Sequence, residues 1–384
     1  MHFIVHNKKD LSKKVALNVK TIDKTTLISS LSNIKLEVID STLIITSFDG
    51  NNCVVSRMDI ENVDGENKSL LIDSVSFKTV VDRFAMTKSE KIKFELLNDT
   101  EELSVQSNKA KLKIKTVIDT SDFNLVPTLE EFASYKKITF EKSQLMKAVN
   151  KVAKCSSRDV TKPELEAINF VTVGNTCEIV SLDGYRIALN VLECESTEDF
   201  KISVSANKLK SILKDVSSND NNSVELKSNG KYTLIQSGDI NIFIREIEGR
   251  LAPYKKLLNA SFNYEITANT DEMSSVVNSS MMATSKDNKV VRLKINPSDS
   301  IIEFSSKGDI ISDFQDEMEV MFNVSDDSDL DIAFNAVYLS ELIGNVDCQN
   351  LKLYIKDSTS PILIKSEDNE EDVYLVLPVR LSVR

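Results

Sequence analysis

Few residues of this sequence could perform catalysis or hold a metal ion. The two histidines, His2 and His6, both lie in the first predicted strand, which leaves almost no material for a histidine-based triad or metal centre. Acidic clusters at 325–331 and 367–372 lack the ligand spacing and the loop glycine of an EF-hand. No GxxxxGK or GxGxxG pattern occurs among the nine glycines, so the usual nucleotide cradles are missing. The sequence therefore favours a binding or scaffolding protein without metal or cofactor over an enzyme.

The clearest chemistry belongs to basic residues on predicted helices, because such cations attract phosphate groups. In one helix three lysines follow at i, i+4 and i+7, away from the apolar side. A single lysine is more often a solvated surface residue, but four helices with the same bias favour a shared basic surface. The cations predicted to face a phosphate backbone are Lys24, Lys78, Arg83, Lys147, Lys151, Lys154 and Lys208.

The overall composition sets outer limits on the protein class. With 59 acidic and 47 basic residues among 384, the net charge of -12 argues against a nucleic-acid binder unless the cations are confined to particular helices. The five cysteines are odd in number and never spaced as CxxC, which indicates reduced thiols and a cytoplasmic location. No run of about 18 apolar residues occurs, so we expect neither a signal peptide nor a membrane span.

Six amphipathic helices must position these cations. Each has apolar residues at the spacing of one buried helical face, and they begin near Leu11, Phe77, Leu145, Leu209, Met273 and Leu339. Alternating strand-like segments lie between them, such as LIITS, KIKFELL, CEIVS, TLIQS, SIIEFS and LKLYIK. A β-α-β-β pattern repeated six times predicts sheets on one side and helices on the other.

An internal repeat of a turn motif divides the chain. The stretch 181–189 reads SLDGYRIAL, and an Asp-Gly pair between apolar positions is a strong hairpin signal. A similar tip recurs as SFDG at 47–50 and as SSKG at 305–308. Irregular segments with one proline each start at Asp119 and Glu248. We therefore predict three similar domains, at residues 1–126, 127–257 and 258–384.

Five motifs in chain order resemble the bacterial DNA polymerase III beta subunit, the sliding clamp family. They are MHFIV at the start, the tip SLDGYRIAL, APYKKLL at 252–258, FNAVYL at 334–339 and YLVLPVRL at 374–381. The family counterparts of the last four are Thr-Asp-Gly-His-Arg-Leu-Ala, Pro-Asp-Tyr-Arg-Arg-Val-Leu, Phe-Asn-Val-Ser-Tyr-Leu and Tyr-Val-Val-Met-Pro-Met-Arg-Leu. The resemblance runs from end to end of the chain.

The resemblance implies an α+β fold of three similar clamp domains, each a twofold β-α-β-β repeat. Two copies joined head to tail would form a ring, with helices lining the hole and sheets outside. Such a homodimer encircles double-stranded DNA without reading its sequence, since lysines facing a phosphate backbone carry no base information. The implied partners are the DNA polymerase III alpha or PolC-type subunit, the clamp loader and other proteins with a clamp-binding motif.

The resemblance also implies a cleft that receives a peptide from these partners. Its matching positions are Leu165, Leu182, Gly184, Tyr185, Arg186, Ile187, Ala252, Lys256, Leu257, Asn335, Tyr338, Thr359, Pro361, Leu375, Leu377, Pro378, Val379 and Arg380. Leu182, Tyr185 and Ala252 depart from the frequent Thr, His and Pro, which predicts a somewhat different peptide preference. The tail Ser382 to Arg384 extends past the usual ending and could reach the mouth of this cleft.

A lysine-rich strand at 110–117, AKLKIKTV, is the predicted subunit interface. In the family the matching strand pairs with an edge of the third domain of the second subunit, and that region is acidic here. We expect Leu112 and Ile114 to supply the apolar part of the contact and to meet Met282. The alternative hypothesis is a clamp-fold scaffold from a mobile element or virus that binds replication proteins without being loaded on DNA.

Overall fold

The computed structural model describes residues 1–22, 28–97, 101–133, 135–159, 161–196, 199–216, 222–285, 289–324, 328–369 and 371–380. Its residues form two compact units, which we describe one at a time. Unit 1 comprises Met1–Met146, Cys194–Val204 and Lys208–Glu246, and unit 2 comprises Lys147–Glu193, Ser205–Asn207 and Ile247–Arg384. The predicted central domain, 127–257, contributes to both units.

The six predicted amphipathic helices are confirmed. They are α1 (Lys8–Thr21), α2 (Ser74–Ala85), α3 (Lys142–Val152), α5 (Ala206–Val216), α7 (Thr270–Met282) and α8 (Ala336–Ile343). Two single-turn helices also occur, α4 (Pro163–Glu166) and α6 (Lys255–Leu258), with 3₁₀ turns η1 (Ser29–Ser32), η2 (Ser121–Leu125), η3 (Glu130–Phe132) and η4 (Ala153–Cys155). Side-chain caps fix several starts: the Asn335 amide oxygen, for example, accepts the N–H groups of Val337 and Tyr338 at the head of α8.

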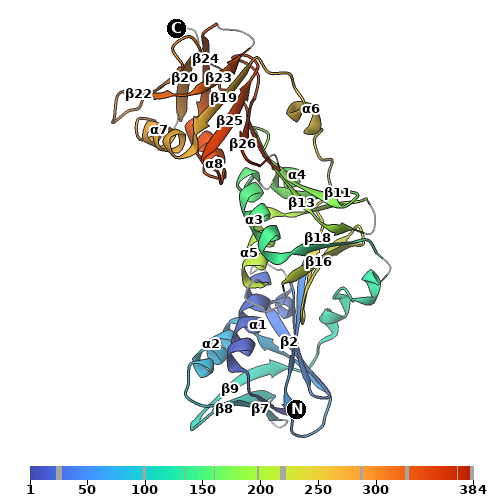
Figure 1. Cartoon of the computed structure of the whole chain (residues 1–384). Coiled ribbons are helices and arrows are strands. Elements are labelled where there is room, and N and C mark those ends of the chain that lie inside the picture. Colours follow the sequence, from blue (N-terminus) through green and yellow to red (C-terminus); the bar gives the residue numbers. More distant parts are fainter. Residues whose placement is uncertain are drawn as a thin grey trace. The chain divides into compact units, whose positions relative to one another are not determined.

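Unit 1 contains a sheet whose neighbouring strands run in the order β14-β10-β16-β17-β18-β4-β3-β2-β6-β9-β8-β7-β1-β5. The strands are β1 (His2–Val5), β2 (Asn33–Ile39), β3 (Thr42–Phe48), β4 (Asn52–Asp59), β5 (Glu61–Asn62), β6 (Lys68–Asp73), β7 (Ile92–Leu97), β8 (Glu102–Ser107), β9 (Ala110–Val117), β10 (Lys137–Glu141), β14 (Glu195–Ser196), β16 (Ser223–Ser228), β17 (Tyr232–Ser237) and β18 (Ile240–Arg245). Helices α1 and α2 lie side by side, and α1 packs on β3 and β4 (Figure 1).

Unit 2 contains a run of paired strands in the order β11-β12-β13-β27-β26-β25-β19-β23 and a second sheet in the order β22-β21-β20-β24. The strands are β11 (Ala167–Val173), β12 (Thr176–Leu182), β13 (Arg186–Glu193), β19 (Tyr264–Asn269), β20 (Val290–Asn296), β21 (Ile301–Ser306), β22 (Phe314–Glu319), β23 (Met321–Val324), β24 (Leu330–Asn335), β25 (Asn350–Ile355), β26 (Ile362–Ser366) and β27 (Asp372–Val376). The remaining strand, β15 (Lys201–Ser205), belongs to unit 1 up to Val204. Helices α7 and α8 pack against each other, and α7 covers β21 and β22 (Figure 1).

Antiparallel pairing explains why the central predicted domain is divided between the units. In unit 1, β18 pairs with β4 over Asn52–Ser56. In unit 2, β13 pairs with β27 from Arg186 to Asn190. Each half of the central domain therefore extends a sheet of its neighbour, and main-chain hydrogen bonds cross both predicted boundaries.

Hydrophobic side chains fill separate cores in the two units. In unit 1, Phe3, Phe77 and Phe94 are fully buried, and the rings of Phe3 and Phe94 stack with centroids 4.7 Å apart. In unit 2, Leu182, Ile187 and Leu375 belong to a cluster beneath the segment that follows Glu248. This second cluster supports the site described next.

The three predicted turn tips differ in structure. Asp49-Gly50 and Asp183-Gly184 are tight hairpin tips with positive φ at the glycine, 92° and 91°. The third is not a tight tip, because β21 and β22 are joined by a longer loop over 307–313. Gly308 serves there for close approach: an added Cβ would lie 2.7 Å from the carbonyl carbon of Ala283.

Candidate functional site

The hairpin between β12 and β13 forms one wall of an apolar cleft in unit 2. Its tip is held by Asp183, whose Oδ1 accepts the N–H groups of Tyr185 at 2.9 Å and Arg186 at 3.0 Å. Gly184 adopts a φ that favours glycine at the turn. The tip thereby presents Leu182, Tyr185 and Ile187 to the cleft.

The cleft has a volume of about 350 Å³ and a mostly apolar surface. The irregular segment at 252–257 supplies the second wall, and β27 with the residue after it supplies the third. Leu377 is anchored by its N–H, which donates to the Tyr185 carbonyl at 2.8 Å. A concave apolar surface with few polar groups suits the apolar side chains of a bound peptide.

Of the predicted cleft residues, the structure brings ten together around this cavity. They are Leu182, Gly184, Tyr185, Arg186, Ile187, Ala252, Lys256, Leu257, Leu375 and Leu377. Two further lining residues, Pro253 and Tyr254, were not predicted, although both lie inside the motif APYKKLL. Tyr254 is 4% exposed and was missed because a tyrosine next to two lysines gives no signal of burial.

Eight predicted residues do not line the cavity. Leu165 packs against the apolar cluster beneath it, and Asn335 caps α8. Tyr338 lies next to a lining residue, since its ring centroid is 6.1 Å from that of Tyr185. The remaining five, on the strand connections and after β27, are Thr359, Pro361, Pro378, Val379 and Arg380.

Arg186 ties the tip of the hairpin to two helical segments. Its Nε donates to Asp183 Oδ2 at 2.9 Å, its Nη2 donates to the Lys154 carbonyl at 2.7 Å, and its Nη1 pairs with Glu341. The guanidinium carbon also lies 4.3 Å from the ring centroid of Tyr338. Burial opposes the charge of Arg186, but the Glu341 and Asp183 carboxylates outweigh it and raise the pKa of the guanidinium.

Glu178 fastens the wall formed by the segment at 252–257. The Tyr254 hydroxyl donates to Glu178 Oε2, and Lys255 Nζ lies 2.8 Å from Glu178 Oε1. Burial first, and then the hydrogen bond to this carboxylate, raise the pKa of the Tyr254 hydroxyl. The phenol therefore stays protonated and continues to donate at neutral pH.

Comparisons with known proteins agree across the whole chain. Family models described as DNA polymerase III beta subunit match its N-terminal domain at residues 1–127, its central domain at 139–253 and its C-terminal domain at 255–380. The chain belongs to the DNA polymerase III beta subunit family.

Similar proteins cover almost the full length of the chain. The beta sliding clamp of Rickettsia bellii is 23% identical over 98% of this chain and 99% of its own. Among solved structures, the beta subunit of Thermotoga maritima has a TM-score of 0.86 at 20% identity, covering 99% of this chain and 100% of its own. The sliding clamp of Bacillus subtilis has a TM-score of 0.87 at 20% identity, covering 99% of each chain. The predicted three-domain clamp fold is confirmed.

In this beta subunit family member, the predicted phosphate-facing cations have different surroundings. Arg83, Lys147 and Lys154 are exposed. Lys78 pairs with Asp82, and Lys208 lies 3.8 Å from Asp49. Lys24 lies outside the described residues, as does the tail Ser382 to Arg384.

Lys151, another predicted cation, is paired with two carboxylates. Its Nζ lies 2.5 Å from Asp372 and 3.0 Å from Asp347, and its side chain is 17% exposed. Although burial opposes the charge, these two carboxylates raise the pKa of Lys151. The charge of Lys151 is thus paired within unit 2, and its contact with DNA stays a prediction.

Among the described residues of unit 1, one edge of the predicted interface strand β9 is largely unpaired. Residues 110–115 pair with β8 on one side, whereas β6 reaches only Thr116 and Val117 on the other. Leu112 is 45% exposed, as expected for a contact residue. Ile114 differs from its prediction, because it is 9% exposed and belongs to the core of unit 1.

In unit 2, β22 lies at the end of its sheet and carries exposed Asp316, Glu317 and Glu319. Met282, at the end of α7, is 65% exposed. Within the described part of the chain, no group of three or more metal-binding side chains occurs. No described helix is long and apolar enough to span a membrane.

Proposed function

We propose that this protein is a DNA sliding clamp, a ring-shaped homodimer that encircles duplex DNA and tethers the replicative polymerase. The observation that carries the proposal is the match of all three beta subunit domains, in order and over nearly the whole chain. The alternative of a scaffold that is not loaded on DNA is not favoured by these matches.

The proposed DNA contact is electrostatic and independent of sequence. Exposed Arg83, Lys147 and Lys154 supply long cationic side chains, while the net charge of -12 keeps the rest of the surface repulsive to phosphate. Such diffuse attraction permits sliding, since no base edge is bound and each phosphate is replaced by the next. The ring remains on DNA because it is closed, so we expect no catalytic step.

Head-to-tail pairing of β9 with β22 of a second copy is the proposed mode of ring closure. Among the described residues, both strands have main-chain groups without a strand partner on one edge. Exposed Lys111 and Lys115 on β9 are opposite in charge to the acidic residues of β22. Leu112 and Met282 supply exposed apolar surface for the same contact. Opposite charges favour this pairing over the contact of two identical edges.

The apolar cleft in unit 2 is the proposed docking site for partner peptides. A polymerase subunit, the clamp loader or a repair protein would insert apolar side chains between Tyr185, Leu257 and Leu377, each of which is more than one third exposed in the free chain. With such partners, we expect the protein to act in the cytoplasm, on the nucleoid.

The decisive experiment is ATP-dependent loading onto nicked circular DNA by a cognate clamp loader, followed by linearising the circle. We expect the protein to stay on the circle and to slide off the linear form. Equal retention on both forms would reject topological linkage and favour simple binding. A linear DNA blocked at both ends by bound protein serves as the control and should retain the clamp.

A further inference from the structure

Two main-chain pairings join predicted domains inside this chain, β4 with β18 and β13 with β27, and we call them joints. In the first joint, Val54 of β4 pairs with Ile242 of β18. In the second joint, Ala188 of β13 pairs with Tyr374 of β27. On their other side, Val54 and Ala188 both pair with the buried serine that opens the repeated motif, SFDG or SLDG. The two joints therefore have the same register relative to the internal repeat.

The third predicted domain contains the same row of residues in β21 and β22. Like the serines of the other two rows, Ser306 is buried and follows the first residue of its strand by five positions. Its hydroxyl donates to the Ser280 carbonyl of α7 at 2.7 Å, so this row lies on the face of the sheet that the helices cover. Ser306 pairs with Phe314 of β22. Phe314 is therefore the counterpart of Val54 in β4 and of Ala188 in β13.

The counterpart of Ile242 is Leu112, on β9. The hairpins β8–β9 and β17–β18 both have two-residue turns, after which the second strand starts at Ala110 and at Ile240. Leu112 and Ile242 each follow that first residue by two positions. The residue two positions beyond Leu112 belongs to the core of unit 1, so Leu112 is on the helix-covered face. A β22 strand added to β9 in the register of the joints would place Phe314 opposite Leu112.

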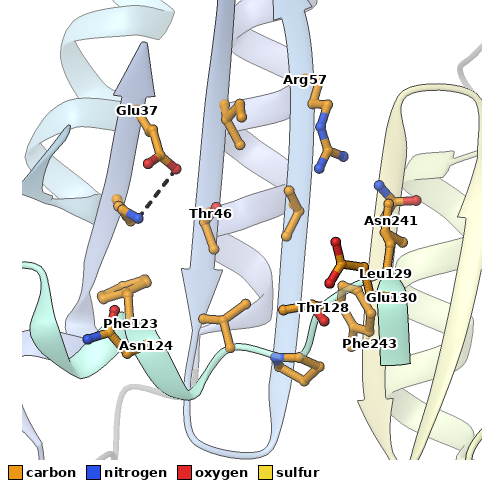
Figure 2. Close-up of a pocket in the computed structure, with 15 residues that line it drawn as sticks. Glu37, Thr46, Arg57, Phe123, Asn124, Thr128, Leu129, Glu130, Asn241 and Phe243 are labelled. Atoms are coloured by element: carbon orange, nitrogen blue, oxygen red, sulfur yellow. Dashed lines mark ion pairs between the residues drawn. The ribbon is translucent and has the colours of Figure 1, made fainter. Parts of the chain in front are cut away.

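The opposite face of the sheet is apolar in both joints inside the chain. Cys53 and Phe243 pair there in the first joint, and each belongs to a hydrophobic cluster. Ile187 and Leu375 pair there in the second joint, within another cluster. Figure 2 shows Phe243 on β18 beside β4, at a pocket of about 550 Å³ that the segment at 123–130 also lines. Buried apolar pairs therefore lie on both faces of each joint inside the chain.

The same face of β9 and β22 is exposed and charged. The register of the joints sets Asp313 opposite Lys113 and Gln315 opposite Lys111, and all four side chains are exposed. Lys113 Nζ already lies 3.2 Å from the Glu102 carboxylate of its own chain, and Asp313 of a second copy would add another carboxylate. Opposite charges directly across two antiparallel strands attract. This pairing would therefore have an apolar row on one face and a charged row on the other.

Other registers lose these matches. A slip of one residue moves the lysines of β9 to the helix-covered face. A slip of two residues in one direction sets Leu112 opposite Asp316. A slip of two residues in the other direction sets Lys113 opposite Ile311. Among these registers, only the one inferred from the internal repeat satisfies both faces.

We propose that a second copy of this chain adds its β22 to β9 in the register that sets Phe314 opposite Leu112 and Asp313 opposite Lys113. The inference rests on the proposed function, since it takes the partner of β9 to be a head-to-tail copy. At the position of Asp313, the two joints inside the chain have apolar residues, against which a lysine would lose its hydration without gaining a counter-charge. The charged row therefore distinguishes the contact between copies from the joints inside the chain.

The test of the register is mild oxidation of full-length double cysteine variants, at a concentration at which each sediments as a dimer. Gln315→Cys with Lys111→Cys should form a covalent dimer, because residues directly opposite each other lie within the reach of a disulfide. Gln315→Cys with Lys113→Cys is the matched control, since it joins the same strands two residues out of register and should cross-link at least about tenfold more slowly. The wild-type chain, oxidised in parallel, gives the background from the five native cysteines.

An exchange of charges tests the pair of Lys113 and Asp313 itself. Lys113→Asp should weaken dimerisation about tenfold in sedimentation equilibrium, because it sets two carboxylates opposite each other. Adding Asp313→Lys to the same chain should restore most of the affinity. Lys356→Asp, at an exposed lysine outside both strands, is the matched control and should dimerise normally.

Three results would overturn the proposal. The first is cross-linking that is as fast in the control pair as in the pair 111 and 315, and the second is an exchange of charges that restores no affinity. Either result in a dimer would leave the proposed ring intact, with another register. The third is a wild-type chain that stays monomeric, which would remove the ring and the register together. Failure of the clamp function would show separately, as equal retention on circular and linear DNA.

Discussion

Replacing Arg186 by methionine should loosen the hairpin that forms the cleft wall. Methionine keeps an aliphatic stem of similar length but removes three donor contacts, to Asp183, Glu341 and the Lys154 carbonyl. Breaking a fully buried pair costs about 3 to 5 kcal/mol when the remaining charge has no compensation. Two features of the site reduce that figure.

The first feature is that Asp183 would keep two backbone donors, the N–H groups of Tyr185 and of residue 186. The second is that the Glu341 side chain is 43% exposed and can be solvated by water. The main losses are then the contact to Asp183 and the unsatisfied Lys154 carbonyl. We expect local opening to become easier by roughly 2 to 3 kcal/mol, which corresponds to exchange roughly 30- to 150-fold faster.

Hydrogen exchange with mass spectrometry, resolved over peptides from 176–193, measures this effect directly. Arg250→Met is the matched control, since Arg250 is exposed and lies outside the cleft. Exchange at 176–193 that equals the wild-type rate would refute the reasoning that Arg186 holds the hairpin. Glu341→Gln should have a smaller effect, because it removes only the half-exposed partner.

Four further predictions concern the cleft, the surface and the interface. Leu377→Asp should abolish binding of a clamp-binding pentapeptide in a calorimetric titration, a loss of about 1 to 3 kcal/mol or more, whereas Val173→Asp, also at an exposed apolar position, should bind normally. The double variant Lys147→Glu with Lys154→Glu should load more slowly on DNA at moderate salt. Normal loading would mean that these lysines face away from DNA. The control is the double variant Lys307→Glu with Lys356→Glu, at two other exposed lysines. Leu112→Lys should give a folded monomer in sedimentation equilibrium, whereas the control Val173→Lys should remain a dimer. If Leu112→Lys is still a dimer at low micromolar concentration, the interface lies elsewhere. The N–H and hydroxyl donors of Thr359 and Ser360 lower the pKa of Asp357 from 3.8 to about 2. Because the folded pKa is depressed, the stability that this carboxylate contributes is present above pH 3.8 and is lost as the pH falls from 3.8 through 2. A midpoint near 3.8 for Asp357 in a carboxyl titration followed by NMR would contradict this prediction.

The regular elements could be predicted because their signals are local. Helical spacing identified the six longer helices, and the Asp-Gly pair identified the hairpin at 183–184. Contacts with partners far away in the sequence could not be predicted in this way. Lys151 shares a helix with Lys147, but its carboxylate partners at 347 and 372 are more than 190 residues away, and helical spacing contains no information on them.

Ile114 was misplaced for a related reason. Alternation along β9 puts Leu112 and Ile114 on one face, but it does not say how far along the strand the core extends. The core ends between these two residues, since Ile114 belongs to it and Leu112 is 45% exposed. The pocket lined by 35–37, 44–46, 55–57, 123–130 and 241–243 was not predicted, because no local pattern joins residues from segments so far apart in the sequence.

The strand pairing across the predicted domain boundaries also affects how freely the sequence of the connecting segments can vary. Backbone hydrogen bonds between β4 and β18, and between β13 and β27, already hold adjacent domains together. The segments at 123–130 and 252–257 are therefore not needed to hold the domains together. Apart from the buried Phe123 and Tyr254, their side chains can vary for recognition, so substitutions such as Ala252 in place of proline can change a binding surface while the continuity of the sheet is preserved.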